Sequence, residues 1–97
     1  MTYQDVSELA NDAPFAGRVA GCLSTEAQGK DDFLADECLR NPVYGASYFM
    51  PFLSGAPGFA DAYAAGGSES IDDGMILSAV QASWAAVSAL YPGPAPE

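Results

Sequence analysis

The sequence predicts an all-α domain, a compact bundle of four to six short helices with a long amphipathic helix at its C-terminal end. A chain of 97 residues, 49% of them hydrophobic, has room for one core and enough apolar side chains to form it. Apolar residues recur three or four positions apart, which is the spacing of one helix face. Capping residues, Gly and Pro separate these runs. Residues 1–91 are therefore expected to form one helical domain, followed by a Pro-rich tail at 92–97.

Two helices are expected near the start of the chain. Thr2 can cap a short first helix because its hydroxyl can accept a backbone N–H of the first turn. Asp12 or Ala13 can cap a second helix, with Pro14 in the first turn, where its missing N–H costs nothing. This second helix is expected to stop at Gly29.

The middle of the chain predicts two more short helices around an aromatic segment. Asp31 or Asp32 can cap the first of them. Its inward-facing residues are expected to be Phe33, Leu34, Cys38 and Leu39. The segment 44–59 is rich in aromatic residues, and Pro51 is expected to kink or interrupt a helix there because it removes an internal hydrogen bond. Two helical turns are then expected over 59–65.

The last helix is expected to run from Ser70 to Tyr91 and to lie at the centre of the bundle. Ser70 and Asp73 stand three positions apart, as in a capping box. The apolar stripe that follows at helical spacing consists of Ile76, Val80, Trp84, Val87 and Tyr91. Pro92 is expected to end the helix.

The charge is strongly negative. Thirteen Asp and Glu residues face three Lys and Arg, for a formal net charge of -10. Such a field repels nucleic acid and anionic membranes, so no direct binding to either is expected. One interpretation is that this field attracts a basic partner surface. The other is that the charge only keeps the protein soluble and discourages self-association, and both interpretations stay open. The N-terminus has no signal-peptide pattern, and no apolar run approaches a membrane span, so a cytoplasmic origin is expected.

No pattern for catalysis or metal binding is present in the sequence. Histidine is absent, which removes the commonest general base and transition-metal ligand. Cys22 and Cys38 are too few for a zinc or iron–sulfur site, and we expect buried free thiols, with a bridge between neighbouring helices as the alternative. Residues 72–74 do not match a calcium loop. We therefore expect a protein that is not an enzyme and has no cofactor and no metal.

The candidate functional residues are aromatic and acidic. Aromatic residues and Met are enriched at the centres of protein interfaces, and segment 44–59 holds more of them than one helix face can bury. They anchor a partner if they point outward, and the alternative is that all of them fill the core. The candidate interface residues are Tyr44, Tyr48, Phe49, Phe52, Phe59, Asp31, Asp32, Asp36 and Glu37. The tail at 92–97 is either a disordered end or an arm that docks in a neighbour's groove.

The turn at 66–73 and the helix 76–84 that follows it resemble small proteins encoded among the virion-assembly genes of tailed bacteriophages, especially phages of high-GC actinobacteria. The resemblance is strongest over 44–91 and extends to 3–6 and 15–19 in the opening. It implies a non-enzymatic virion component that packs as a homo-oligomer, or in many copies, against capsid or head-to-tail connector proteins at the neck.

The expected function is therefore that of a structural component of a tailed-phage virion, made in the host cytoplasm. It would bind capsid or neck proteins through aromatic and acidic surfaces, and many copies in a lattice would support each weak contact. The alternative is a free acidic inhibitor or DNA mimic that occupies a basic site on a host nucleic-acid-binding protein. DNA mimicry requires that Asp31, Asp32, Asp36 and Glu37 lie on one face of the protein at the spacing of DNA phosphates.

Overall fold

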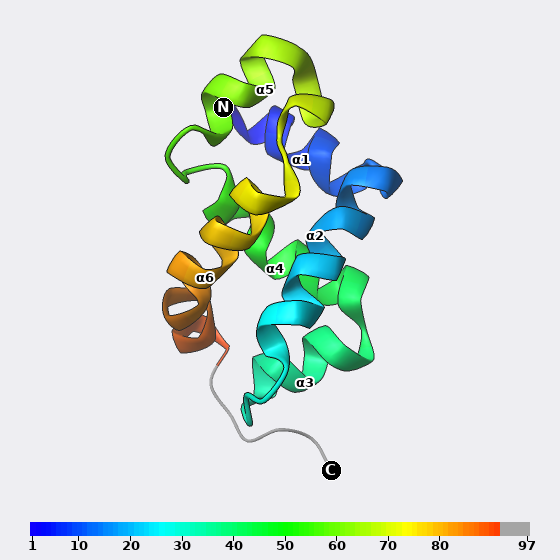
Figure 1. The fold of residues 1–97 in the computed structure, drawn as a ribbon, viewed down its shortest axis with the longest axis vertical. Coiled ribbons are helices and arrows are strands. Elements are labelled where there is room, and N and C mark those ends of the chain that lie inside the picture. Colours follow the sequence, from blue (N-terminus) through cyan, green and yellow to red (C-terminus); the bar gives the residue numbers. More distant parts are fainter. Residues whose placement is uncertain (92–97) are drawn as a thin grey trace.

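The computed structural model describes residues 1–91, which form six α-helices and one short 3₁₀ helix (Figure 1). These elements are α1 (Tyr3–Asn11), α2 (Ala13–Ala27), α3 (Phe33–Arg40), α4 (Pro42–Leu53), α5 (Phe59–Gly66), the 3₁₀ helix η1 (Gly67–Ser70) and α6 (Asp73–Leu90). The predicted all-α class is confirmed. The radius of gyration, 12.7 Å, is close to the value of about 13 Å typical of a compact 100-residue domain. The tail predicted at 92–97 lies outside the described residues.

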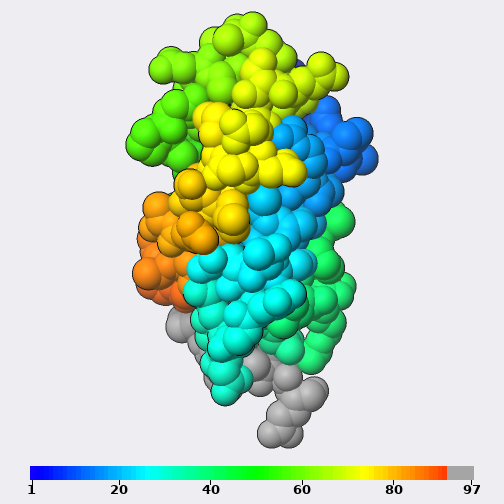
Figure 2. Space-filling view, in the orientation of Figure 1, coloured from blue at the N-terminus to red at the C-terminus, as the bar shows by residue number. Residues whose placement is uncertain are grey.

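Helix α2 is the central element of the bundle. It packs against α1, α3, α4 and α6, and its Phe15, Val19 and Leu23 side chains are buried. Figure 2 shows α2 beside α6 on one face of the molecule, and Figure 1 shows α5 at one end and α3 at the other. The expectation that the last helix lies at the centre is wrong, because α6 packs on α2 and α4 and leaves an alanine-rich face exposed.

Side-chain caps fix the start of the first three helices. The Oγ1 atom of Thr2 accepts the N–H of Asp5 at 3.1 Å, and the Asp5 carboxylate accepts the N–H of Thr2 at 2.9 Å, which completes a capping box. Asp12 and Asp32 cap α2 and α3 by accepting the backbone N–H three residues further on, at 2.9 and 2.7 Å. The cap predicted at Thr2 is confirmed, and of the alternatives left open for the next two helices Asp12 and Asp32 are the caps.

The last helix begins later than the sequence predicted. Asp72 is its cap, since the Asp72 carboxylate accepts the N–H of Met75 at 2.8 Å. Ser70 instead ends η1, which begins at Gly67 with a φ of 71° that favours glycine. The cap predicted at Ser70 is therefore wrong, because a turn of 3₁₀ helix occupies that position and Ile71 separates it from the true cap.

Helix α6 is the longest of the described helices, at 18 residues, but its two faces differ little in hydrophobicity. It buries the predicted positions Ile76, Val80, Trp84 and Val87. Its outer face, however, is formed largely by alanine, and Asp73 is the only charged residue in the helix. The exposed alanines are Ala82, Ala85, Ala86 and Ala89. The amphipathic character expected of this helix is therefore not confirmed.

Helix α4 continues through Pro51 and ends two residues later, at Leu53. Of the two outcomes expected at Pro51, a kink or an interruption, the interruption does not occur. Proline removes one internal hydrogen bond, and this loss is tolerated here because Pro51 lies in the final turn and its ring is exposed.

Arg18 ties α2 to the segment that precedes α6. Its Nε donates to Oδ1 of Asp73 at 2.8 Å, and Nη1 donates to the carbonyl oxygen of Ser68 at 3.1 Å. Its Nη2 donates to the carbonyl oxygen of Ile71. One guanidinium thus satisfies three acceptors that lie 50 or more positions away in the chain, and so holds η1 and the start of α6 against α2.

Replacing Arg18 tests this connection. Arg18→Ala removes a donor from two partly buried carbonyl groups, of which that of Ser68 keeps the backbone N–H of Ile71, and is expected to lower the free energy of unfolding by about 1–3 kcal/mol. Asp73→Ala removes only the exposed carboxylate partner and is expected to cost less, about 0.3–1 kcal/mol. Urea denaturation of both variants measures the difference. Equal losses would contradict the role given to the carbonyl contacts.

The position of the α6 cap has its own test. Asp72→Ala is expected to lower the free energy of unfolding by about 0.5–2 kcal/mol, because the N–H of Met75 loses its acceptor. Ser70→Ala is expected to change it by less, because Ser70 has no capping role in α6. Thermal unfolding followed by circular dichroism compares the two proteins, and the reverse order of stabilities would restore Ser70 as the cap.

Candidate protein-interaction surface

The structure divides the aromatic candidates between the core and the surface. Phe49 lies against Trp84, with ring centroids 5.4 Å apart, and Phe59 meets Phe15 edge to face at 6.1 Å. Phe49 and Phe59 are 0% and 1% exposed. Their prediction as interface residues is therefore wrong, because side chains without exposed area cannot contact a partner.

Tyr44 and Tyr48 remain at the surface and form an aromatic row with Tyr91. The ring of Tyr44 meets that of Tyr48 edge to face at 5.3 Å, and Tyr48 stacks on Tyr91 at 4.2 Å. Tyr44 is 60% exposed, and the other two are half-buried. The row connects the first half of α4 to the end of α6 and fixes the ring orientations.

Helix α3 approaches α4 closely at Gly45, the residue that follows Tyr44. A Cβ atom at Gly45 would lie 2.8 Å from Sγ and 3.1 Å from Cα of Cys38, so only glycine fits there. Cys38 is fully buried by this contact. The next residue, Leu39, is 51% exposed, and the prediction that it faces inward is wrong.

Large aliphatic side chains are also exposed on α3, α4 and α6, the helices that carry or adjoin the tyrosine row. Six large apolar side chains are exposed in the described residues, and four of them are Leu39, Val43, Tyr44 and Leu90. Residues 40–44 also line a shallow hollow of about 360 Å³. We call the following set the tyrosine surface: Leu39, Val43, Tyr44, Tyr48, Leu90 and Tyr91. Sequence reasoning found only Tyr44 and Tyr48, because the other four fit a core stripe or a helix end equally well.

Glu37 lies close to the tyrosine surface. Burial is the main cause of the raised pKa of Tyr48, with further contributions from the neighbouring tyrosines and the Glu37 carboxylate. Burial also raises the pKa of the Cys38 thiol to about 11, and the charges of Asp32 and Glu37 add to this effect. Both groups are therefore neutral at neutral pH, and Glu37 supplies negative charge beside the apolar area.

The four acidic candidates are used in different ways. One oxygen of Asp32 caps α3, and the other accepts the Nε1–H of Trp84 at 3.4 Å. Asp36 pairs with Arg40 at 3.1 Å, whereas Asp31 is exposed and Glu37 half-buried. Two of the four carboxylates are thus committed to contacts within the chain. Fewer acids remain for a row that could imitate DNA phosphates.

All three basic side chains of the sequence form ion pairs with carboxylates. The pairs are Arg18 with Asp73 at 2.8 Å, Lys30 with Glu26 at 2.8 Å and Arg40 with Asp36 at 3.1 Å. The Lys30 ammonium also lies over the Trp84 ring, 5.0 Å from its centroid. The described part of the chain therefore presents no cluster of unpaired Lys or Arg side chains, and the excess of acidic residues makes its electrostatic field negative.

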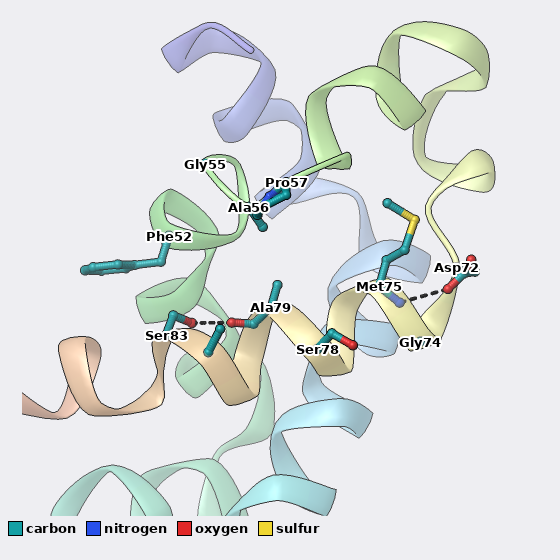
Figure 3. A pocket seen from close by; sticks show the side chains of 11 residues that line it. Phe52, Gly55, Ala56, Pro57, Asp72, Gly74, Met75, Ser78, Ala79 and Ser83 are labelled. Atoms are coloured by element: carbon teal, nitrogen blue, oxygen red, sulfur yellow. Dashed lines mark hydrogen bonds between the residues drawn. The ribbon is translucent and has the colours of Figure 1, made fainter.

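Phe52, the remaining aromatic candidate, belongs to a separate groove (Figure 3). The groove has a volume of about 710 Å³ and lies between residues 52–57 and the first half of α6. Phe52 is half-buried at one end, and Met75 and Asp72 lie toward the other. The groove shares no residue with the tyrosine surface.

Within residues 1–91 no group of three or more Cys, Asp or Glu side chains is placed to hold a metal ion. Both cysteines are free thiols, so the alternative of a bridge between Cys22 and Cys38 is not realised. Among the described helices, none combines the length and the apolar content needed to cross a membrane.

Comparison of the chain with protein-family models, with curated proteins and with solved structures found no match.

The state of Cys38 can be checked by thiol reactivity. A Cys22→Ser protein keeps only Cys38, and we expect it to react with a disulfide reagent at pH 8 only after urea unfolds it, because the thiolate is the reactive form. The folded pKa of about 11 lies above the ordinary value of 9.0. The stabilising contribution of the neutral thiol is thus complete below pH 9 and is lost as the pH rises toward 11. Rapid reaction of the folded protein at pH 8 would contradict the burial.

Proposed function

We propose that this chain is a non-enzymatic, protein-binding component of a tailed-phage virion, and that it binds capsid or neck proteins through the tyrosine surface and the acidic charge around it. The observation that carries the proposal is the surface row in which Tyr44 is exposed and Tyr48 and Tyr91 are half-buried. Stacked aromatic rings bury a large area in a partner and lose little conformational freedom on binding. Folded monomers seldom expose aromatic and aliphatic residues together without such a use.

The charge distribution supports a basic partner. The formal net charge is -10, and Arg18, Lys30 and Arg40 are all paired within the chain. A positive surface would therefore be attracted to this domain, and a second copy would be repelled. Many copies could still gather on one particle, each held by a shared lattice of partner proteins.

The virion as location rests on the resemblance of the segment 66–84 to small virion-assembly proteins. In the fold this segment comprises the end of α5, η1 and the first turns of α6. Mass spectrometry of purified particles is the direct experiment for this part of the proposal. Stoichiometric amounts of the chain in particles would support it, and its presence only in infected cytoplasm would overturn it in favour of a free inhibitor.

Two matched variants test whether the tyrosine surface is the binding site. Tyr44→Ala is expected to weaken binding to the capsid or neck protein at least about tenfold, the effect typical of a central interface residue. Tyr3→Ala removes an equally large side chain, 88% exposed on α1, and is expected to leave binding unchanged. Biolayer interferometry with proteins released from disrupted particles measures both. Equal affinities of the two variants would show that the tyrosine surface is not the binding site.

A further inference from the structure

The groove beside α6 has the length and form of a site for a helical segment. Its α6 side extends from Asp72 to Ser83, a span of about 16 Å at a rise of 1.5 Å per residue, or three helical turns. Residues 52–57 form the opposite wall (Figure 3). A peptide helix of similar length could therefore lie along it.

The lining of the groove is apolar over most of this length. Phe52, Pro57 and Met75 supply large side chains, and a methionine can adapt its shape to different partners. Ala79 and Ala82 are small, which lets the backbone of a docked helix come close to α6. Such a groove accepts a helix that presents apolar residues at i, i+4 and i+7.

Asp72 marks one end of the groove with a negative charge. It is exposed, and one of its oxygens caps α6 by accepting the N–H of Met75 at 2.8 Å. Among residues 1–91 it is the only charged residue that lines the groove, and the Arg18–Asp73 pair lies outside it. A basic side chain at that end of a docked helix would find an opposite charge beside it.

We infer that this groove docks an apolar, helix-forming segment of a basic partner protein, with a Lys or Arg of that segment next to Asp72. A second copy of this chain is a poor occupant, because each copy carries a net charge of -10. The inference rests on the proposed protein-binding function and adds to it a second contact and the chemistry of the segment bound there.

Two synthetic peptides test the inference directly. Both have about 14 residues with Leu at helical positions i, i+4 and i+7, and they differ only in ending with two Lys or two Glu residues. Fluorescence anisotropy of the labelled peptides is measured against the full chain. The Lys peptide is expected to bind at least about threefold more tightly than the Glu peptide. Failure of both peptides to bind, or equal affinities, would overturn the inference.

Variants locate the bound peptide on the domain. Ala82→Arg places a long side chain in the groove and is expected to reduce peptide affinity at least about tenfold. Ala86→Arg makes the same change at an exposed alanine of the same helix outside the groove, and is expected to have little effect. If both variants bind the peptide equally well, the groove is not its site.

The charge at the end of the groove is tested by a variant that keeps the cap. Asparagine caps helices about as well as aspartate, so Asp72→Asn is expected to keep the fold and to weaken the Lys peptide about threefold. Asp12→Asn makes the same change at the cap of α2, outside the groove, and should leave affinity unchanged. If Asp72→Asn and Asp12→Asn weaken binding of the Lys peptide equally, Asp72 acts only through the net charge of the molecule, which would contradict its proposed contact with the peptide.

The outcomes separate this inference from the proposed function. If Tyr44→Ala abolishes binding to virion proteins but no peptide enters the groove, the inference fails and the function stands. If the Lys peptide binds at the groove but the chain is absent from particles, the groove is a docking site and the virion role fails.

Discussion

Arg18 ties the start of α6 to α2. This side chain joins α2 to the carbonyl groups of Ser68 and Ile71 and to the carboxylate of Asp73, directly before and at the start of the helix. Both exposed apolar features depend in turn on where α6 lies. Its first half forms one side of the groove, and Tyr91 just beyond its last residue stacks on Tyr48.

The scarcity of positive charge gives the surface its character. Three basic residues face thirteen acidic ones, and all three are paired inside the molecule, one with a further contact to Trp84. What remains outside is negative charge interrupted by tyrosine, leucine, valine and alanine. The negative field of such a surface favours positively charged partners over negatively charged ones, and its apolar area adds affinity. The charged and the apolar parts therefore favour the same class of partner.

The sequence predicted the features that local chemistry determines. Thr2, Asp12 and Asp32 cap helices as expected, because a cap depends on a side chain and the next three residues. Ser70 met the same local criteria but failed, since residues 67–70 form a 3₁₀ helix, and the Ser68 carbonyl in it accepts a hydrogen bond from Arg18, 50 positions away.

The candidate site was harder to predict for a similar reason. Periodicity placed Phe49 and Tyr48 in one aromatic segment, but only the packing of α4 against α3 and α6 decides that one is buried and the other is not. Leu39 and Cys38 are likewise neighbours in sequence with opposite exposure. The groove involves a loop and a helix about twenty residues apart, and no local pattern brings them together.

The apolar areas beside α6 are the surfaces by which this domain is proposed to contact a partner. Amide chemical shifts of the isotopically labelled chain, recorded by NMR with and without the capsid or neck protein it binds, test this claim most directly. The account predicts that the largest changes fall in residues 39–48, 72–83 and 88–91. Changes confined to α1 and α5, with those three ranges unaffected, would contradict it.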